Sequence, residues 1–331
     1  MRKVSMTAGC FVMSLAVFAL GAPGAFGQAS GGQWVVPRTP DGHPDLQGVW
    51  ANNNITPLER PEVWADKAEL SDEEVAALRV AAANAVGDGD ALFGDQLVLA
   101  AIQGVEATSY DPTTGNYNQF WIADRDFTNQ TSLVIDPPTG RIPDVLPDTR
   151  ERLREAGQYG RDHPADSYTD RPLPERCVSY GVPRLGAGYN SYYQIFQSAD
   201  HVVIMYEMIH DARVIPLGDQ PRLDDGVRLL HGDSRGRWDG DTLVVETTNY
   251  SSSASFRGSS DGLHMVERFS RVAPDKLQWE VTITDPTVWS APWTVRIPLV
   301  YSPEPMFEYA CHEGNIGMEG ILAGHRYEER I

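Results

Sequence analysis

Basic residues, cysteines and long apolar runs are all scarce in this sequence, and each shortage excludes a class of protein. The chain of 331 residues has 46 Asp and Glu against 27 Lys and Arg, a formal net charge of −19. So acidic a surface repels a nucleic-acid backbone and an anionic lipid surface, which excludes both as partners. After the N-terminal region no run of 18 apolar residues occurs, so we expect a soluble mature chain whose partner is a small-molecule ligand or substrate.

The usual sequence motifs of cofactor chemistry are missing as well. The chain has no Gly-x-Gly-x-x-Gly, no P-loop, no His-Glu-x-x-His and no Cys-x-x-Cys motif, and we expect no serine-nucleophile elbow. Nucleotide-dependent and zinc-peptidase activities therefore lose their usual support, and no cofactor is predicted. Any chemistry must come from residues that the fold brings together.

The N-terminus has the features of an export signal. Arg2 and Lys3 precede an apolar run over residues 10–26, which small residues end just before Gln28. This order predicts a signal peptide over residues 1–27 and a periplasmic or secreted mature protein. The alternative, a transmembrane anchor, is disfavoured because the run is short and is interrupted by glycine and proline.

Two cysteines, Cys177 and Cys311, remain once that peptide is removed. An even pair in an exported protein predicts a disulfide bond. The alternative is a Cys311 thiolate nucleophile beside His312, which needs Cys177 to stay unpaired.

The second half of the chain has the composition of a sheet. Segments rich in Val, Ile, Thr, Tyr and Trp follow one another without intervening helices. They are residues 192–197, 202–209, 213–217, 242–248, 264–271, 277–284 and 293–301. Asp239-Gly240 is a strong hairpin-turn signature. The pattern predicts a mainly β fold, an antiparallel barrel or strongly curved sheet that is lipocalin-like in general character.

The first half of the chain predicts a helical and loop-rich wrap. Its expected elements are an extended arm over 28–45, a first strand over 44–50, a capping box at 71–74 that begins a helix, further helices over 92–102 and 149–159, and a strand over 131–135. We expect one domain over 28–331, with residues 46–190 rich in helix and loop and residues 191–331 forming the sheet.

Carboxylates and a histidine in the strand candidates suggest acid–base chemistry. Glu207 and Glu267 each lie between apolar neighbours, where burial raises the pKa of an unpaired carboxyl group. His210 and Arg213 stand at a strand end, where loops open onto ligands. The alternative for Glu267 is a structural pair with an arginine inside the sheet.

Residues 232–238 place Asp233 and Arg235 between glycines. Glycines let a backbone approach a ligand closely, and an arginine can hold a carboxylate or sulfate with two hydrogen bonds. The alternatives are a polar hairpin with a self-satisfied Asp–Arg pair and a calcium loop, which the spacing disfavours.

The segment 308–315 is the densest polar cluster. His312 and Glu313 supply a base and an acid there, which a disulfide at Cys311 would hold in place. His264 is predicted to bind substrate or to join His210 and His312 in a metal site, although no pair has local ligand spacing. Tyr193 and Trp289 are predicted either to line a small-molecule pocket or to lie in the core.

Several motifs resemble a family of uncharacterised exported bacterial proteins from soil and marine bacteria. They are residues 44–50 (PDLQGVW), 131–134 with 136–137, 188–190, 232–247 (GDSRGRWDGDTLVVET) and 308–315 (EYACHEGN). The resemblance spans nearly the whole mature chain. It implies export and a single continuous domain, and it carries no activity and no catalytic residues.

Together these residues predict an exported, cofactor-independent lyase, isomerase or hydrolase for a small organic or sugar-like substrate. Its predicted catalytic residues are His210, Glu267, Asp233, His312 and Glu313, and its predicted substrate-binding residues are Arg213, Arg235, Tyr193, Trp289 and His264. The alternative is an extracytoplasmic binding protein for an apolar or carbohydrate ligand. Convergence of the titratable residues around one cavity favours the enzyme.

Overall fold

The computed structural model describes residues 34–85, 95–105, 126–181, 183–187, 189–253, 256–259 and 261–331. The predicted signal peptide and the first part of the arm lie outside these residues. Residues 36–331 form one compact unit. Within the described ranges, no helix has both the length and the apolar character needed to cross a membrane.

Ten strands form a single sheet, which confirms the mainly β prediction. The order is β5-β4-β3-β1-β10-β9-β8-β7-β6, with β2 paired to β10. Every pairing of neighbouring strands is antiparallel. The strands are β1 Gly48–Ala51, β2 Val134–Asp136, β3 Tyr192–Gln197, β4 His201–Tyr206, β5 Ala212–Pro216, β6 Asp233–Asp239, β7 Thr242–Thr248, β8 His264–Ala273, β9 Lys276–Thr284 and β10 Trp293–Ser302.

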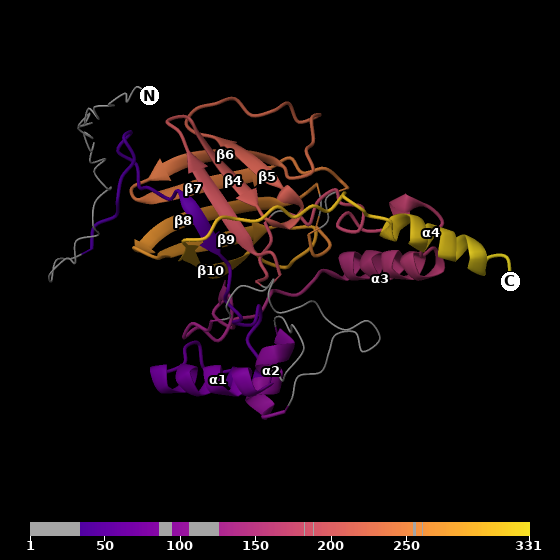
Figure 1. The fold of residues 1–331 in the computed structure, drawn as a ribbon, viewed down its shortest axis with the longest axis horizontal. Helices are drawn as coiled ribbons and strands as arrows, with labels where there is room; N and C mark the ends of the chain where they lie inside the picture. The colour runs from indigo at the N-terminus through magenta and orange to yellow at the C-terminus, as the bar shows by residue number, and fades with distance from the viewer. Residues whose placement is uncertain are drawn as a thin grey trace, which may run out of the picture. The chain divides into compact units, whose positions relative to one another are not determined.

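The sheet is strongly curled, as Figure 1 shows, and its two edge strands approach each other. Where β5 approaches β6, the backbone pairs through a bridge just after the end of β5, from Leu217 to Gly236, and Gly218 N–H donates to the Gly236 carbonyl at 3.1 Å. A Cβ on Gly236 would lie 2.7 Å from the Leu217 side chain, so glycine permits the approach. A regular ladder between β5 and β6 is missing among the described residues, so the sheet curls without closing into a barrel.

Alternating side chains of the long strands build the core inside the curl. In β9, Leu277, Trp279, Val281 and Ile283 are buried while the residues between them are half-buried or exposed. Trp50 and Trp293 from β1 and β10 join the same cluster. Period-two alternation with one apolar face is what an antiparallel sheet packed on one side requires.

The helices lie outside this core. They are α1 Asp72–Ala85, α2 Asp95–Gln103, α3 Pro147–Asp162 and α4 Gly317–Glu328. The predicted capping box begins α1: Ser71 N–H donates to Glu74 Oε2 at 2.8 Å and Glu74 N–H donates to Ser71 Oγ at 3.3 Å. Apolar side chains of α1 and α2 pack with Ile55 and Phe127 in a second cluster. Helix α4 was not predicted from the sequence.

One strand prediction is wrong at its end. β4 stops at Tyr206 instead of continuing to residue 209, and the chain then turns over residues 207–211. Tyr206 N–H donates to the Asp211 carbonyl at 2.7 Å and closes this turn. The apolar residues Met208 and Ile209 are buried in the turn itself, so an apolar run alone did not distinguish it from strand.

Candidate functional site

The turn between β4 and β5 has a strained backbone. Ile209 and His210 are consecutive residues in the left-handed region, with φ of 60° and 50°. A β-branched residue in that region is a rare outlier and costs about 1–3 kcal/mol. Glu207 begins this turn and Asp211 ends it, so the strain positions two buried carboxylates.

Asp211 holds a serine and a histidine in one hydrogen-bonded cluster. Ser179 Oγ donates to Asp211 Oδ2 at 2.9 Å and accepts from Gly181 N–H at 2.9 Å. His231 Nε2 lies 2.7 Å from Ser179 Oγ and 3.5 Å from Asp211 Oδ1. Because a hydroxyl has one proton, Ser179 cannot donate to both neighbours, and His231 Nε2 therefore carries the proton in this arrangement. Its Nδ1 is then the nitrogen with the free lone pair.

Burial favours a neutral imidazole on His231. Desolvation lowers the pKa of this histidine, the Asp211 charge opposes the shift, and the Arg213 charge adds to it. The side chain keeps 21% of its surface exposed. A partly accessible imidazole that burial keeps neutral, and whose far nitrogen is hydrogen-bonded to a serine hydroxyl beside a carboxylate, has the properties of a general base.

Gly232 explains why His231 occupies this place. Its φ is +70°, and a Cβ there would lie 2.7 Å from both the Thr247 side chain and the Thr248 carbonyl. Only glycine fits so close to β7. The turn is also anchored by Leu229, whose carbonyl accepts from Ser251 N–H at 2.8 Å.

Glu207 is the second perturbed group of the turn. Desolvation raises the pKa of its carboxyl group, against hydrogen bonds from the Asn190 side chain and the backbone of Tyr192 and Phe307. The residue is 3% exposed, and Oε2 has no hydrogen-bond partner among the described residues. The sequence prediction of a raised pKa for a buried Glu207 agrees with the direction of this shift.

A cavity of about 460 Å³ is lined by Asn190, whose side chain also hydrogen-bonds Glu207. Glu207 itself is not among the lining residues of this cavity. The disulfide between Cys177 and Cys311 forms part of its wall, which confirms the predicted pairing and leaves no Cys311 thiolate. Other lining residues are Tyr189, Glu308, Tyr309, Glu313 and Asn315. This volume suits a small polar molecule.

The structure pairs Glu267 with Arg213 and so supports the structural alternative for Glu267. Arg213 Nη1 and Nη2 donate to the two carboxylate oxygens at 2.6 and 2.9 Å, and Trp279 Nε1 adds a third hydrogen bond at 3.1 Å. Both side chains are buried. Neither residue lines a cavity described here, and the charge of each is balanced by the other.

Asp233 and Arg235 likewise satisfy each other. They form an ion pair on β6, and Asp233 Oδ2 also accepts from Leu223 N–H at 3.0 Å. Residues 232–236 do match the pattern Gly-x-Ser-x-Gly, but Ser234 is a buried strand residue that bonds Thr247 Oγ1 at 2.9 Å. A nucleophile elbow needs a strand-to-helix turn, which is not found here.

The other predicted residues lie apart. His312 is exposed, Glu313 lines the disulfide cavity, and His264 Nε2 lies 2.9 Å from Glu246 Oε1. Tyr193 donates its hydroxyl to the Arg184 carbonyl at 2.9 Å, and Trp289 packs on Trp293; both are core residues. His210 lies in the strained turn beside Asp211. The structure does not gather His210, Glu267, Asp233 and His312 around one cavity.

Sequence reasoning missed Ser179, Asp211 and His231. They are separated by 32 and 20 positions along the chain, so no local spacing marks them. The available signals were indirect: Asp211 follows His210, and His231 precedes the glycine of the 232–238 motif.

No family model matches the chain, and no curated protein matches its sequence.

Proposed function

We propose that this protein is a cofactor-independent acid–base enzyme whose site is built on the turn Glu207–Asp211. The observation that carries the proposal is the partly exposed His231 imidazole, whose pKa is lowered by burial and whose Nε2 lies 2.7 Å from Ser179 Oγ and 3.5 Å from Asp211 Oδ1. The substrate class is a small organic or sugar-like molecule, and the reaction a lyase, isomerase or hydrolase step.

In this proposal His231 Nδ1 removes a proton from a substrate carbon or from water. The resulting imidazolium lies beside the Asp211 carboxylate, which stabilises its charge. Ser179 orients Asp211 and the imidazole and does not itself attack, because its one proton is given to Asp211.

Glu207 is the proposed general acid. Its raised pKa keeps more of it protonated near neutral pH, while the lowered pKa of His231 keeps that group unprotonated. Both shifts favour the uncharged form of the group, and a protonated carboxyl group and an unprotonated imidazole are the starting states of a general acid and a general base. The cavity beside Asn190 is the proposed entry for substrate.

The proposed location is the periplasm or the extracellular space. The predicted signal peptide and the disulfide support it, since a disulfide persists in an oxidising compartment. The near contact of β5 and β6 supports the proposal that the curled sheet is a lipocalin-like barrel left open at one seam.

The test is a screen of the purified mature protein against chromogenic esters and glycosides, with solvent-deuterium exchange into α-hydroxy and keto acids. His231→Gln and Glu207→Gln should each lower the rate about 100-fold or more. His264→Gln is the matched control, since His264 is a half-buried histidine with a carboxylate partner outside the proposed site. Full activity in both site variants would overturn the proposal. Binding without turnover would support the binding-protein alternative.

A further inference from the structure

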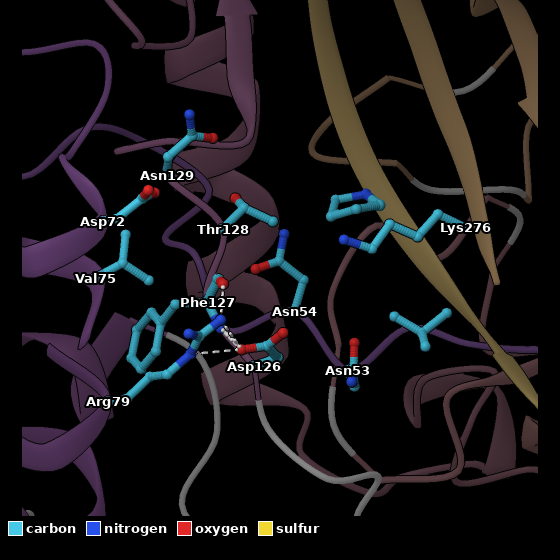
Figure 2. A pocket seen from close by; sticks show the side chains of 12 residues that line it. Asn53, Asn54, Asp72, Val75, Arg79, Asp126, Phe127, Thr128, Asn129 and Lys276 are labelled. Atoms are coloured by element: carbon cyan, nitrogen blue, oxygen red, sulfur yellow. Dashed lines mark hydrogen bonds and ion pairs between the residues drawn. The ribbon is translucent and has the colours of Figure 1, made fainter. Parts of the chain in front are cut away.

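A second cavity, of about 380 Å³, lies between α1, residues 126–129 and the strands β9 and β10. Figure 2 shows side chains entering it from these elements. Its lining residues are Asn53, Asn54, Asp72, Val75, Arg79, Asp126, Phe127, Thr128, Asn129, Lys276, Pro298 and Val300. None of them belongs to the proposed acid–base site.

Asn54 brings an unsatisfied donor to this cavity. The residue is 4% exposed, and its Oδ1 accepts from Thr56 N–H at 2.9 Å, which fixes the orientation of the amide. Nδ2 then has no hydrogen-bond partner among the described residues. In Figure 2 this amide points into the space between α1 and the sheet. An unpaired buried donor is destabilising, so such a group is retained more readily where a ligand completes it.

Lys276 brings a second donor from the sheet side. The chain has three lysines, Lys3, Lys67 and Lys276. Lys67 is paired with Glu74, whereas within the described part of the chain Lys276 has no carboxylate partner. Its ammonium group extends toward Asn54 in Figure 2. Two unpaired donors from different elements thus face one space.

The rest of the wall combines apolar side chains, such as Val75 and Phe127, with polar ones. Arg79 and Asp126 are 2.7 Å apart and neutralise each other, so neither offers a net charge to a ligand. Asp72, Thr128 and Asn129 supply carboxylate, hydroxyl and amide groups. Mixed donors and acceptors suit hydroxyl groups, which both donate and accept.

We propose that this cavity binds a small hydroxylated carboxylate, of the size of a sugar acid. Its carboxylate accepts hydrogen bonds from Lys276 Nζ and Asn54 Nδ2, and its hydroxyl groups bond the polar wall around Asp72 and Thr128. Both hydrogen bonds are charge-assisted because the carboxylate is ionised, and in the one from Lys276 the donor is ionised as well. The site is independent of the proposed enzyme activity.

The test uses the intact mature protein and D-gluconate as the probe. Acetic anhydride labels accessible lysines, and mass spectrometry after digestion gives the labelling ratio of Lys276 to Lys67. D-gluconate should lower this ratio at least fivefold, with a Kd tighter than about 1 mM. D-glucose, which lacks the carboxylate, should protect weakly. Equal protection by D-glucose, or no protection by D-gluconate, would overturn the proposal.

Two variants test the assigned contacts by calorimetric titration with D-gluconate. Asn54→Asp keeps the Oδ1 acceptor but replaces the free donor with a carboxylate oxygen, and should weaken binding more than tenfold. Lys276→Met, an exposed change that does not threaten folding, should do the same. Lys67→Met is the matched control and should bind like the unmodified protein. Unchanged affinity in either site variant contradicts the assignment.

Discussion

Arg213 and Glu267 join β5 to β8 through the inside of the curled sheet. The guanidinium of one meets the carboxylate of the other at 2.6 and 2.9 Å, and both side chains are buried, at 4% and 0% exposure. The Glu267 charge also contributes to raised pKa values of Tyr206 and Tyr250, though burial is the main cause for both tyrosines. This ion pair therefore acts on the buried tyrosines of the surrounding core.

Removal of one partner of this pair should be strongly destabilising. Glu267→Gln leaves the Arg213 charge buried without its partner, and Arg213→Met does the same to the Glu267 charge. Each variant should lower the free energy of unfolding by about 3–5 kcal/mol. The double variant Arg213→Met/Glu267→Leu should lose less than the sum of the two. Urea unfolding followed by fluorescence measures all three, and additive losses would contradict the direct coupling.

The disulfide should contribute to stability through the long loop that it closes. Cys177 and Cys311 are 134 positions apart, and loops of this length correspond to about 2–5 kcal/mol of stabilisation. The double variant Cys177→Ser/Cys311→Ser should unfold at lower urea concentration by that amount. A reductant should produce the same shift in the unmodified protein and none in the variant.

The pH dependence of stability should carry a contribution from His231. Because burial lowers its pKa in the folded protein, the unfolded chain binds the proton first as pH falls. Stability should decline as pH drops below about 6.5 and level off below the folded pKa. His231→Gln should remove that contribution. An NMR titration that places the His231 pKa above the ordinary value would contradict the proposed neutral base.

Gly232 and Gly240 both have a positive φ but differ in how crowded their surroundings are. Ala at 240 meets no atom within 4 Å and should cost about 1 kcal/mol from backbone strain alone. Ala at 232 also collides with Thr247 and the Thr248 carbonyl, so Gly232→Ala should cost at least twice as much. It should also move His231 and shift its NMR signals. Equal costs in thermal unfolding would show that the β7 contact is unimportant.

Local features were predictable wherever a short segment decided its own structure. The capping box at 71–74 began α1, and Asp239-Gly240 turned β6 into β7 as expected. In the long strands β8, β9 and β10, buried and more exposed residues alternate because one face of each strand packs on the core, and this alternation is visible in the sequence. The end of β4 was not predictable in this way, because both strand and turn there bury apolar side chains.

The candidate site depended on contacts between distant segments. Glu207 was marked by its apolar neighbours, but nothing near Ser179 or His231 in the chain indicates that they meet at Asp211. Likewise, the apolar neighbours of Glu267 predicted that it is buried, but its pairing with Arg213 depends on the curl of the sheet.

The sequence by itself determined the mainly β architecture, because strand periodicity and turn chemistry act over a few residues. The cysteine pair and the acidic character follow directly from the composition. The tertiary structure decided which polar groups meet. The curl of the sheet places β5 beside β6. Ser179, Asp211 and His231 meet in the folded chain, and burial there lowers the pKa of His231. Such shifts depend on desolvation and on charges distant in sequence, which no local pattern encodes.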